Sequence, residues 1–436
     1  MAAPLKLGLA GLGTVGASVV RLLAEQRALL TQRCGRPIEV VAVTARSRNK
    51  KRDVNLRKMR WLRDPMALAI DPEIDVFVEL IGGEGDPAST AVEVALRAGK
   101  SVVTANKALI AKRGVELAAI AEKQGVSLNF EAAVAGAIPI VKALREGLSG
   151  NSVARVYGIL NGTCNYILTR MEEAGLPFAD ALKEAQALGY AEADPTFDVE
   201  GYDTAQKLAI LASLTFGTKA SVASVYVEGI SSIAPADLAA AEELGYRVKL
   251  LGVAVKTETG IEQRVHPTMV PRSSAIAQVM GVTNAVTIDA HGIAPITLVG
   301  PGAGGLATAS SVIADIADIA RGARVAPFGR PVGQLTASKK APMQRHEGGY
   351  YIRLDARDRP GTAATIATRL AEQQISLESI VQRHRDVAPA ERKAGSVPVI
   401  MITYATSEDA VRKALAAVRA DRVISGKPQV VRIEKN

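Results

Sequence analysis

The chain has 436 residues, of which 48% are hydrophobic and 22% charged, a composition that argues against a disordered chain and against a single small module. The net charge of +9 is modest for this length and selects neither nucleic acid nor a membrane as a partner. The two cysteines, Cys34 and Cys164, exclude a disulfide framework, and no run has the pattern of a secretion signal or a membrane span. We therefore expect a cytoplasmic protein of two or three domains without a membrane partner.

Short apolar runs alternate with helical patterns over residues 1–140. The run 5–10 stops at glycines, and apolar residues then recur at helical spacing over 14–30. This alternation predicts a doubly wound, Rossmann-type parallel sheet with helices on both faces. The further strand-like runs are 38–44, 75–81, 101–104 and 126–130, and the helical stretches between them include 88–98 and 115–124.

The pattern changes from Val153 onward and predicts a mixed α+β domain, to which we assign residues 141–305. A helix over 306–325 has an apolar face with which it could return to the first domain and complete it. The strand-like runs of this part are 153–160, 249–255 and 285–288, and its helical segments are 166–174, 179–188 and 205–214.

The C-terminal part divides into a linker and a small domain. Residues 326–348 contain prolines, glycines and basic residues without periodicity, which predicts a linker. Residues 349–436 have the order strand, helix, strand, strand, helix, strand, which predicts a ferredoxin-like βαββαβ domain. Its elements are expected at 350–354, 363–373, 377–382, 397–405, 408–418 and 429–433.

A glycine-rich loop joins the first strand to the first helix. Gly11, Gly13 and Gly16 follow the GxGxxG pattern, and Thr14 and Val15 open the helix. The first glycine permits a tight turn, the second lets the backbone approach a pyrophosphate, and the third lets helix and strand pack closely. A purely structural glycine turn is the alternative, but the position between strand and helix favours a dinucleotide site, whose phosphates a helix N-terminus attracts.

The residues after the second strand suggest which dinucleotide binds. An NAD site usually has Asp or Glu here, whereas this chain has Arg46 and Arg48. Guanidinium groups pair well with phosphate oxygens, so we predict NADP, with NAD possible. A solvated surface run or a nucleic-acid patch would also explain these arginines. Aromatic residues make up only 4% of the chain, so we expect no nucleic-acid partner.

Carboxylates gather ahead of a lysine within residues 189–207. Asp203 and Lys207 are four residues apart, so they share one face of a predicted helix, and Glu192 and Asp198 lie in the loop before it. A surface ion pair would explain the first two residues alone, but not the crowding of the others in the same loop. The cluster predicts a site that holds an ammonium group beside a lysine able to transfer a proton.

Two further residues lie where predicted elements end. Lys107 follows a predicted strand at the sheet edge where open α/β sheets bind ligands, although a lone lysine there is often only a surface residue. Thr163 ends the turn 158–163 just before a predicted helix, where a simple helix cap is the alternative.

Taken together, these motifs resemble those of homoserine dehydrogenases. The resemblance covers residues 5 to about 325 and implies NAD(P)-dependent interconversion of L-aspartate 4-semialdehyde and L-homoserine, on the route to threonine and methionine. It rests on GLGTVG (11–16), ELIGG (79–83), GKSVVTANK (99–107), FEAAVAGAIPI (130–140), GILNGT (158–163), the acidic segment from residue 189 and GPGAGG (300–305).

The resemblance also implies roles for single residues. It makes Lys207 the proton donor to the carbonyl oxygen, with Lys107 beside it, and makes Asp198 a carboxylate needed for activity. The implied substrate-binding residues are Glu192, Asp203 and Thr163. The implied cofactor-binding residues are Gly11, Gly13, Thr14, Val15, Gly16, Arg46, Lys107, Gly189 and Gly304. A monovalent cation, Na⁺ by its oxygen ligands, is implied at Glu131, Val134, Gly136 and Ile138.

The C-terminal domain, 349–436, resembles an ACT domain through the DRPG turn at 358–361. The resemblance implies threonine as an effector and a homodimer or homotetramer, with 141–305 as the catalytic and dimerisation domain. DRPG is also simply good turn and helix-start chemistry. Two alternatives stay open: another NAD(P)-dependent aldehyde or hydroxyacid dehydrogenase, and a catalytically degenerate amino-acid sensor that binds a dinucleotide.

Overall fold

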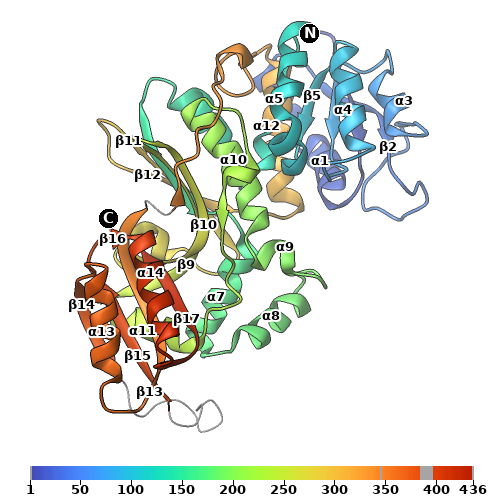
Figure 1. Cartoon of the computed structure of the whole chain (residues 1–436). Coiled ribbons are helices and arrows are strands. Elements are labelled where there is room, and N and C mark those ends of the chain that lie inside the picture. Colours follow the sequence, from blue (N-terminus) through green and yellow to red (C-terminus); the bar gives the residue numbers. More distant parts are fainter. Residues whose placement is uncertain (1, 344–345, 383–395, 435–436) are drawn as a thin grey trace.

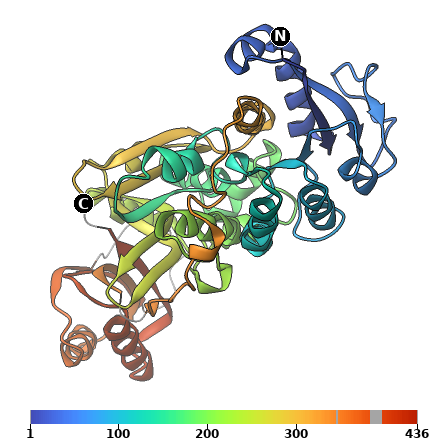
Figure 2. The same ribbon diagram turned by 90° about the horizontal axis from the view of Figure 1, so that it is seen from above.

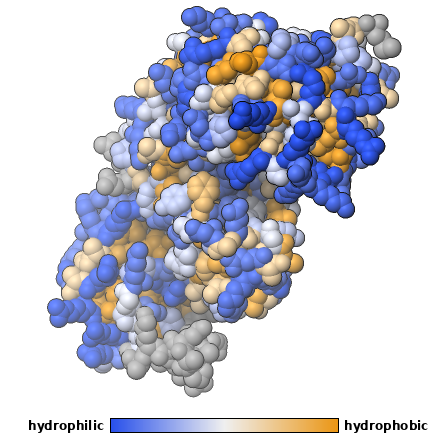
Figure 3. Space-filling model, turned by 90° about the vertical axis from the view of Figure 1, so that its right-hand side faces the viewer, coloured by the Kyte–Doolittle hydropathy of each residue, from blue (hydrophilic) through white to orange (hydrophobic). Residues whose placement is uncertain are grey.

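The computed structural model describes residues 2–343, 346–382 and 396–434. The N-terminal domain lies at one end of the molecule, the C-terminal domain at the other, and the central domain joins them (Figures 1 and 2). Polar side chains cover most of the face shown in Figure 3, and apolar ones gather in small patches between them. One cluster of buried apolar residues includes Phe77, Leu208 and Val431, so the three parts share a core.

The N-terminal domain is built on a six-stranded parallel sheet with the strand order β3-β2-β1-β4-β5-β6. The predicted Rossmann-type sheet is therefore confirmed. The direction of strand order reverses between β1 and β4, which is where doubly wound sheets bind dinucleotides. The strands are β1 (Leu5–Ala10), β2 (Ile38–Thr44), β3 (Arg60–Trp61), β4 (Val76–Glu79), β5 (Ser101–Thr104) and β6 (Leu128–Asn129).

Helices cover both faces of this sheet (Figure 1). Helix α12 packs against α1, as the apolar face of the predicted helix 306–325 required. The predicted helix start at residue 115 is wrong: α5 begins at Lys107, because the Asn106 side chain accepts a hydrogen bond from the Leu109 amide and caps the helix there. The helices are α1 (Thr14–Glu25), α2 (Arg27–Cys34), α3 (Pro65–Ala69), α4 (Ala88–Arg97), α5 (Lys107–Gln124) and α12 (Gly305–Ala320).

The central domain packs its helices against an antiparallel part of a second sheet, in the order β12-β11-β7-β9-β10. The sequence prediction missed β10 and β12. Strand β10 carries Glu262, Arg264 and His266, all buried, so its polar residues hid the apolar pattern of a buried strand. The strands are β7 (Val153–Ile159), β8 (Tyr226–Val227), β9 (Tyr246–Thr257), β10 (Gly260–Pro271), β11 (Thr283–Ala290) and β12 (Ile296–Pro301).

The helices of the central domain carry most of its candidate site residues. None of the helices in the described parts of the chain is long and apolar enough to cross a membrane. The helices are α6 (Ile140–Lys142), α7 (Gly162–Ala174), α8 (Phe178–Ala187), α9 (Thr196–Val199), α10 (Tyr202–Phe216) and α11 (Pro235–Glu243).

The C-terminal domain has the predicted βαββαβ order, and its apolar core lies between its strands and α13 and α14. Its sheet continues that of the central domain, because β17 pairs with β10 in parallel. Residues 383–395 and 435–436 of the predicted domain lie outside the described residues. The elements are β13 (Glu347–Arg357), α13 (Thr362–Glu372), β14 (Leu377–Gln382), β15 (Ser396–Thr403), β16 (Thr406–Ser407), α14 (Glu408–Ala420) and β17 (Ile424–Ile433).

The segment predicted as a linker packs on the domains that it joins. Phe328 is fully buried, with its ring centroid 5.3 Å from that of Phe130. Farther along, Thr336 forms a bridge with Thr218. The segment 326–348 stays predicted as a linker, and its described part contacts other domains through the buried ring of Phe328 and the bridge of Thr336.

Candidate active site

A cavity of about 560 Å³ lies between the N-terminal and central domains. Its lining includes residues from the first or second turn of α1, α5, α7, α10 and α12. Because the N-terminus of a helix carries unpaired amides and a partial positive charge, this convergence favours a ligand with anionic groups. Lining residues used below are Val15, Lys107, Asn161, Thr163, Gly189, Tyr190, Asp198, Asp203, Lys207, Val282, Asn284, Gly302 and Gly304.

Asp203 lies between the two lysines of the cavity. In α10, Lys207 Nζ donates to Asp203 Oδ2 over 2.7 Å and to the Leu160 carbonyl over 2.6 Å. Lys107 Nζ, from the start of α5, lies 3.2 Å from the other carboxylate oxygen, Oδ1. The aspartate thus fixes an ammonium group from each domain in one place.

Asn161 joins this group to the second aspartate. Its amide nitrogen donates to Asp198 Oδ1 over 2.7 Å and to Asp203 Oδ2 over 2.9 Å. Its amide oxygen accepts from the Cys164 amide and caps α7. The helix-cap interpretation of this turn is therefore correct, and the same side chain also orders the acidic cluster.

Charge and burial separate the pKa values of the two aspartates. Burial of Asp203 acts to raise its pKa, but the charges of Lys207 and Lys107 and the hydrogen bonds from Lys207 and Asn161 prevail and lower the pKa to about 2. Burial raises the pKa of Asp198, and the charge of Asp203 adds to this effect. Asp203 is therefore a permanent anion at neutral pH, and a pair of unequal carboxyl groups is a common feature of catalytic sites.

The glycine loop has the shape that a dinucleotide requires. A Cβ on Gly11 would lie 2.4 Å from the Leu80 carbonyl oxygen, and one on Gly16 would lie 2.1 Å from the Gly11 carbonyl oxygen. Both glycines therefore allow close backbone packing. A Cβ on Gly13 would meet nothing within 4 Å, and Gly13 is the N-cap of α1. The open space at this helix N-terminus fits a pyrophosphate.

Basic side chains surround the loop after β2. Arg46 is exposed, and Arg52 Nε donates to the carbonyl of Leu12 in the glycine loop over 2.9 Å. The guanidinium groups of Arg48 and Arg52 each lie 5.7 Å from the ring centroid of Trp61. Arg52 thus ties the basic loop to the glycine loop, a link that the sequence prediction did not include.

Not every expected residue reaches the cavity. Glu192 is exposed and is absent from the cavity lining, whereas Thr163 lines the cavity and donates through Oγ1 to the Tyr190 carbonyl over 2.6 Å. Gly189 and Gly304 line the cavity as expected. The substrate role of Glu192 would therefore require that its loop moves when a ligand binds.

The residues expected at the cation site form a buried loop beside the cavity. The two carboxylate oxygens of Glu131 accept the amides of Val141 and Lys142, both over 2.8 Å. The Gly136 carbonyl accepts from Ser311 Oγ over 2.7 Å. The Glu131 carboxylate and the Gly136 carbonyl thus each accept hydrogen bonds from the protein, and all four residues expected at the cation site, Glu131, Val134, Gly136 and Ile138, lie in this one loop.

Several lining residues were not predicted individually. Asn284 is buried and its carboxamide has no hydrogen-bond partner among the described residues, and Gly302 packs directly on that carboxamide. Tyr190 and Val282 complete the wall. Asn284 lies on β11 outside any motif with a known chemistry, so only its packing reveals it.

Comparisons with known proteins agree with this geometry. Family models described as "Homoserine dehydrogenase, NAD binding domain", "Homoserine dehydrogenase" and "ACT domain" match residues 11–131, 139–317 and 350–421. The homoserine dehydrogenase of Neisseria gonorrhoeae is 44% identical over 99% of both chains, and that of Pseudomonas aeruginosa is 46% identical with the same coverage.

Solved structures are similar as well. The crystal structure of a homoserine dehydrogenase from Thiobacillus denitrificans is 43% identical, covers 99% of this chain and 98% of its own, and has a TM-score of 0.91. A hyperthermophilic archaeal homoserine dehydrogenase in complex with NADPH is 27% identical, covers 72% of this chain and 97% of its own, and has a TM-score of 0.60. The family models and the full-length relatives show that the chain belongs to the homoserine dehydrogenase family, whose members are oxidoreductases that act on a CH–OH group.

Proposed function

We propose that Lys207 is the proton donor and acceptor in the interconversion of L-homoserine and L-aspartate 4-semialdehyde. Hydride addition to an aldehyde builds negative charge on its oxygen, and a nearby ammonium group both stabilises that charge and supplies the proton. When bound, the nicotinamide cofactor supplies the hydride or accepts it. The observation that carries this proposal is the position of Lys207 on the cavity wall, held by Asp203 and the Leu160 carbonyl.

Lys107 and Asp203 complete the proposed chemistry. Lys107 lies on the side of the N-terminal domain and provides a second positive charge near the developing oxyanion. Asp203 orients both lysines, and with Asp198, Thr163 and Glu192 it would bind the polar groups of the amino-acid substrate. The anionic state of Asp203 suits it to a substrate ammonium group.

The proposal is tested by removing each lysine separately. In Lys207→Ala we expect turnover to fall by about a thousandfold while the Kd of the cofactor changes little. In Lys107→Ala we expect a smaller loss, because Lys207 remains. Initial rates of L-homoserine oxidation and fluorescence titration of the cofactor give the two quantities. Near-normal turnover of Lys207→Ala would remove it from this role.

NADP is the cofactor that we propose in preference to NAD. A carboxylate for the ribose hydroxyl is missing after β2, and the exposed Arg46 and the neighbouring Arg48 stand in the segment where it would be expected. Guanidinium groups bind phosphate oxygens in a bidentate way. The open space at Gly13 supports pyrophosphate binding in both cofactors alike.

Three finer points extend the proposal. A monovalent cation, Na⁺ in the first instance, would bind the main-chain carbonyls of the loop 131–138, and no chemical step depends on it. Threonine is proposed as the effector of the ACT domain. A homodimer or homotetramer is the proposed assembly. Each is testable directly, by cation-dependent unfolding temperature, by rates with added threonine and by light scattering.

A further inference from the structure

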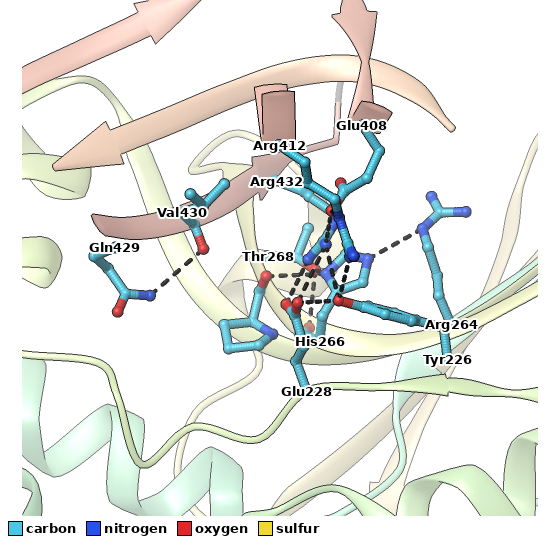
Figure 4. A network of polar contacts seen from close by, with 11 residues as sticks. Tyr226, Glu228, Arg264, His266, Thr268, Glu408, Arg412, Gln429, Val430 and Arg432 are labelled. Carbon is cyan, nitrogen blue, oxygen red and sulfur yellow. Dashed lines mark hydrogen bonds and ion pairs between the residues drawn. The ribbon is translucent and has the colours of Figure 1, made fainter. Parts of the chain in front are cut away.

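The central and ACT domains meet at a seam of charged side chains, most of which are buried. We define this seam by the following residues: Tyr226 of β8, Glu228 just after β8, Arg264 on β10, Glu408 on α14, Arg432 of β17, and Glu434 just after β17. Figure 4 shows most of these side chains converging between the two domains. The backbones also join here, because Thr268 and Met269 of β10 pair with Arg432 and Ile433 of β17. The two domains are therefore linked by both sheet pairing and ion pairs.

Arg432 is the centre of the seam and binds carboxylates of both domains. Its Nη1 donates to Glu228 Oε2 of the central domain over 2.6 Å. Its Nε and Nη2 donate to the two carboxylate oxygens of Glu408 in the ACT domain, over 3.0 and 2.7 Å. The Arg432 side chain is only 3% exposed, and Tyr226 donates its hydroxyl to Glu228. One buried guanidinium group thus holds Glu228 in a fixed place.

The chain around Glu228 is in direct contact with the acidic loop of the active site. The Glu228 amide donates to the Val265 carbonyl, and the Ile230 amide donates to the Val199 carbonyl over 2.9 Å. A Cβ on Gly229 would lie 2.4 Å from the Val199 carbonyl oxygen, so the two backbones touch. Ser231 Oγ also donates to Glu200 Oε1 over 2.6 Å. The segment 228–231 therefore packs directly against residues 199–200 and is hydrogen-bonded to both of them.

The two aspartates of the cavity lie in the chain on either side of the contacted residues 199–200. Asp198 immediately precedes Val199, and Asp203 follows two residues after Gly201. A Cβ on Gly201 would lie 2.9 Å from Val265 Cγ1, so this turn also packs on β10 beside the seam. A displacement of the segment 228–231 would therefore move the backbone that carries both carboxylates.

We infer that Glu228 is a positioning residue for the acidic loop and that Arg432 of the ACT domain holds it in place. The ACT domain thereby contributes to the geometry of the active site through an ion pair across the seam. This inference rests on the proposed roles of Asp198 and Asp203. It assigns to Glu228 and Arg432 no contact with the substrate or the cofactor.

The seam allows Glu228 to be changed without leaving a buried charge unpaired. In Glu228→Gln, Arg432 keeps both hydrogen bonds to Glu408, and the Glu228 side chain is itself 39% exposed. Removing the charge of an exposed ion-pair partner lowers the free energy of unfolding far less than removing that of a buried partner. The variant is therefore expected to fold and to retain its ACT domain in contact.

The test measures steady-state kinetics of Glu228→Gln in the full-length chain. We expect kcat/KM for L-homoserine to fall about tenfold through a higher KM, because small displacements of binding groups are costly. The KM for the cofactor stays within about twofold, because the glycine loop is unaffected. A merely structural role would lower the unfolding temperature and kcat and would leave the KM for L-homoserine unchanged.

Two further variants make the test decisive. Glu434→Gln is the matched control, since Glu434 also pairs across the seam, with Arg264 and Arg155, but does not contact the segment 228–231. Its KM for L-homoserine should equal that of the wild type. Arg432→Lys retains a positive charge for Glu408 and should raise the KM for L-homoserine as Glu228→Gln does. The double variant Glu228→Gln/Arg432→Lys should have the same KM as either single variant, because both changes remove the same interaction.

The outcomes separate this inference from the proposed function. Wild-type KM values in both Glu228→Gln and Arg432→Lys, or an equal increase in Glu434→Gln, would overturn the positioning role. Asp198→Asn in the same assay tests the proposed function independently. If Asp198→Asn is impaired and Glu228→Gln is not, only the positioning role fails, whereas unimpaired turnover in Asp198→Asn contradicts the role of the loop itself.

Discussion

Lys207 and Asp203, one helical turn apart in α10, form an ion pair of 2.7 Å in the wall of the cavity between two domains. The pair is shielded, since the two side chains are only 13% and 7% exposed. Lys107 reaches the same carboxylate from the other domain. The arrangement makes the orientation of the proposed proton donor depend on a single carboxylate.

Replacing that carboxylate should therefore disable both lysines. In Asp203→Asn the side chain keeps its size but loses its charge, and we expect turnover to fall by about a hundredfold or more. Asp180→Asn is the control, because Asp180 forms an exposed ion pair with Lys183 in α8. Initial rates of L-homoserine oxidation measure the effect. Turnover near the wild-type value in Asp203→Asn would show that the lysines do not depend on it.

The buried carboxyl group of Asp315 is expected to destabilise the protein increasingly as the pH rises. Burial, followed by the charge of Glu131, raises the pKa of Asp315 to about 7 in the folded protein, against 3.8 as the ordinary value. Well below pH 3.8, at about pH 2 to 3, the group is protonated in both states and has almost no effect on stability. As the pH rises toward 7 only the unfolded state ionises freely, so the ionisable side chain progressively destabilises the fold.

Asp315→Asn should therefore raise the free energy of unfolding by about 2 to 4 kcal/mol at pH 8 and by only about 0.5 kcal/mol at pH 4. The asparagine oxygen can still accept the hydrogen bond that Asp315 Oδ2 receives from the Glu131 amide over 2.8 Å. Urea unfolding at the two pH values measures the difference. A gain that is the same at pH 4 and pH 8 would contradict the raised pKa.

Arg46 should determine the choice between the two cofactors. Arg46→Asp removes a phosphate partner and supplies a carboxylate for a ribose hydroxyl, so we expect the Kd of NADPH to rise about tenfold or more and that of NADH to change little. Arg272→Asp changes the net charge equally at an exposed site in the central domain. Fluorescence titration with both cofactors tests this, and equal weakening of both would refute phosphate pairing.

The glycines of the loop should respond differently to the same substitution. A Cβ on Gly16 would lie 2.1 Å from a backbone oxygen, so Gly16→Ala should lower the stability of the N-terminal domain by about 1 to 3 kcal/mol. Gly13→Ala has room for its methyl group and should keep the wild-type unfolding temperature while cofactor affinity falls. Thermal unfolding and cofactor titration separate the two effects. Unchanged affinity in Gly13→Ala would place the pyrophosphate elsewhere.

The sequence was most informative where a local pattern decides the structure. Strand β1, the loop 11–16 and α1 are contiguous, so their roles follow from spacing alone. Asp203 and Lys207 could be placed on one helix face for the same reason. The start of α5 was missed because it is set by a single capping side chain, Asn106, which lies two residues after the end of β5.

Contacts between distant segments could not be predicted from such patterns. The pairing of β10 with β17 joins residues more than 160 positions apart, and the polar side chains of β10 hide the strand itself. The contacts of Asn161 with both aspartates likewise arise only when the N-terminal end of α7 meets α9, which carries Asp198, and the start of α10, which carries Asp203. Glu192 is the opposite case. It is close in sequence to the two aspartates that line the cavity, but it does not line the cavity itself.

The most direct test of the proposed catalytic role is a single-turnover measurement on the variant that lacks both lysines. Reduction of L-aspartate 4-semialdehyde by NADPH is followed at saturating cofactor in the wild type, in Lys207→Ala and in Lys107→Ala/Lys207→Ala. We predict that, at saturating NADPH, the double variant reduces the aldehyde slower by at least about a thousandfold. A rate within about tenfold of the wild type would contradict proton transfer by these lysines.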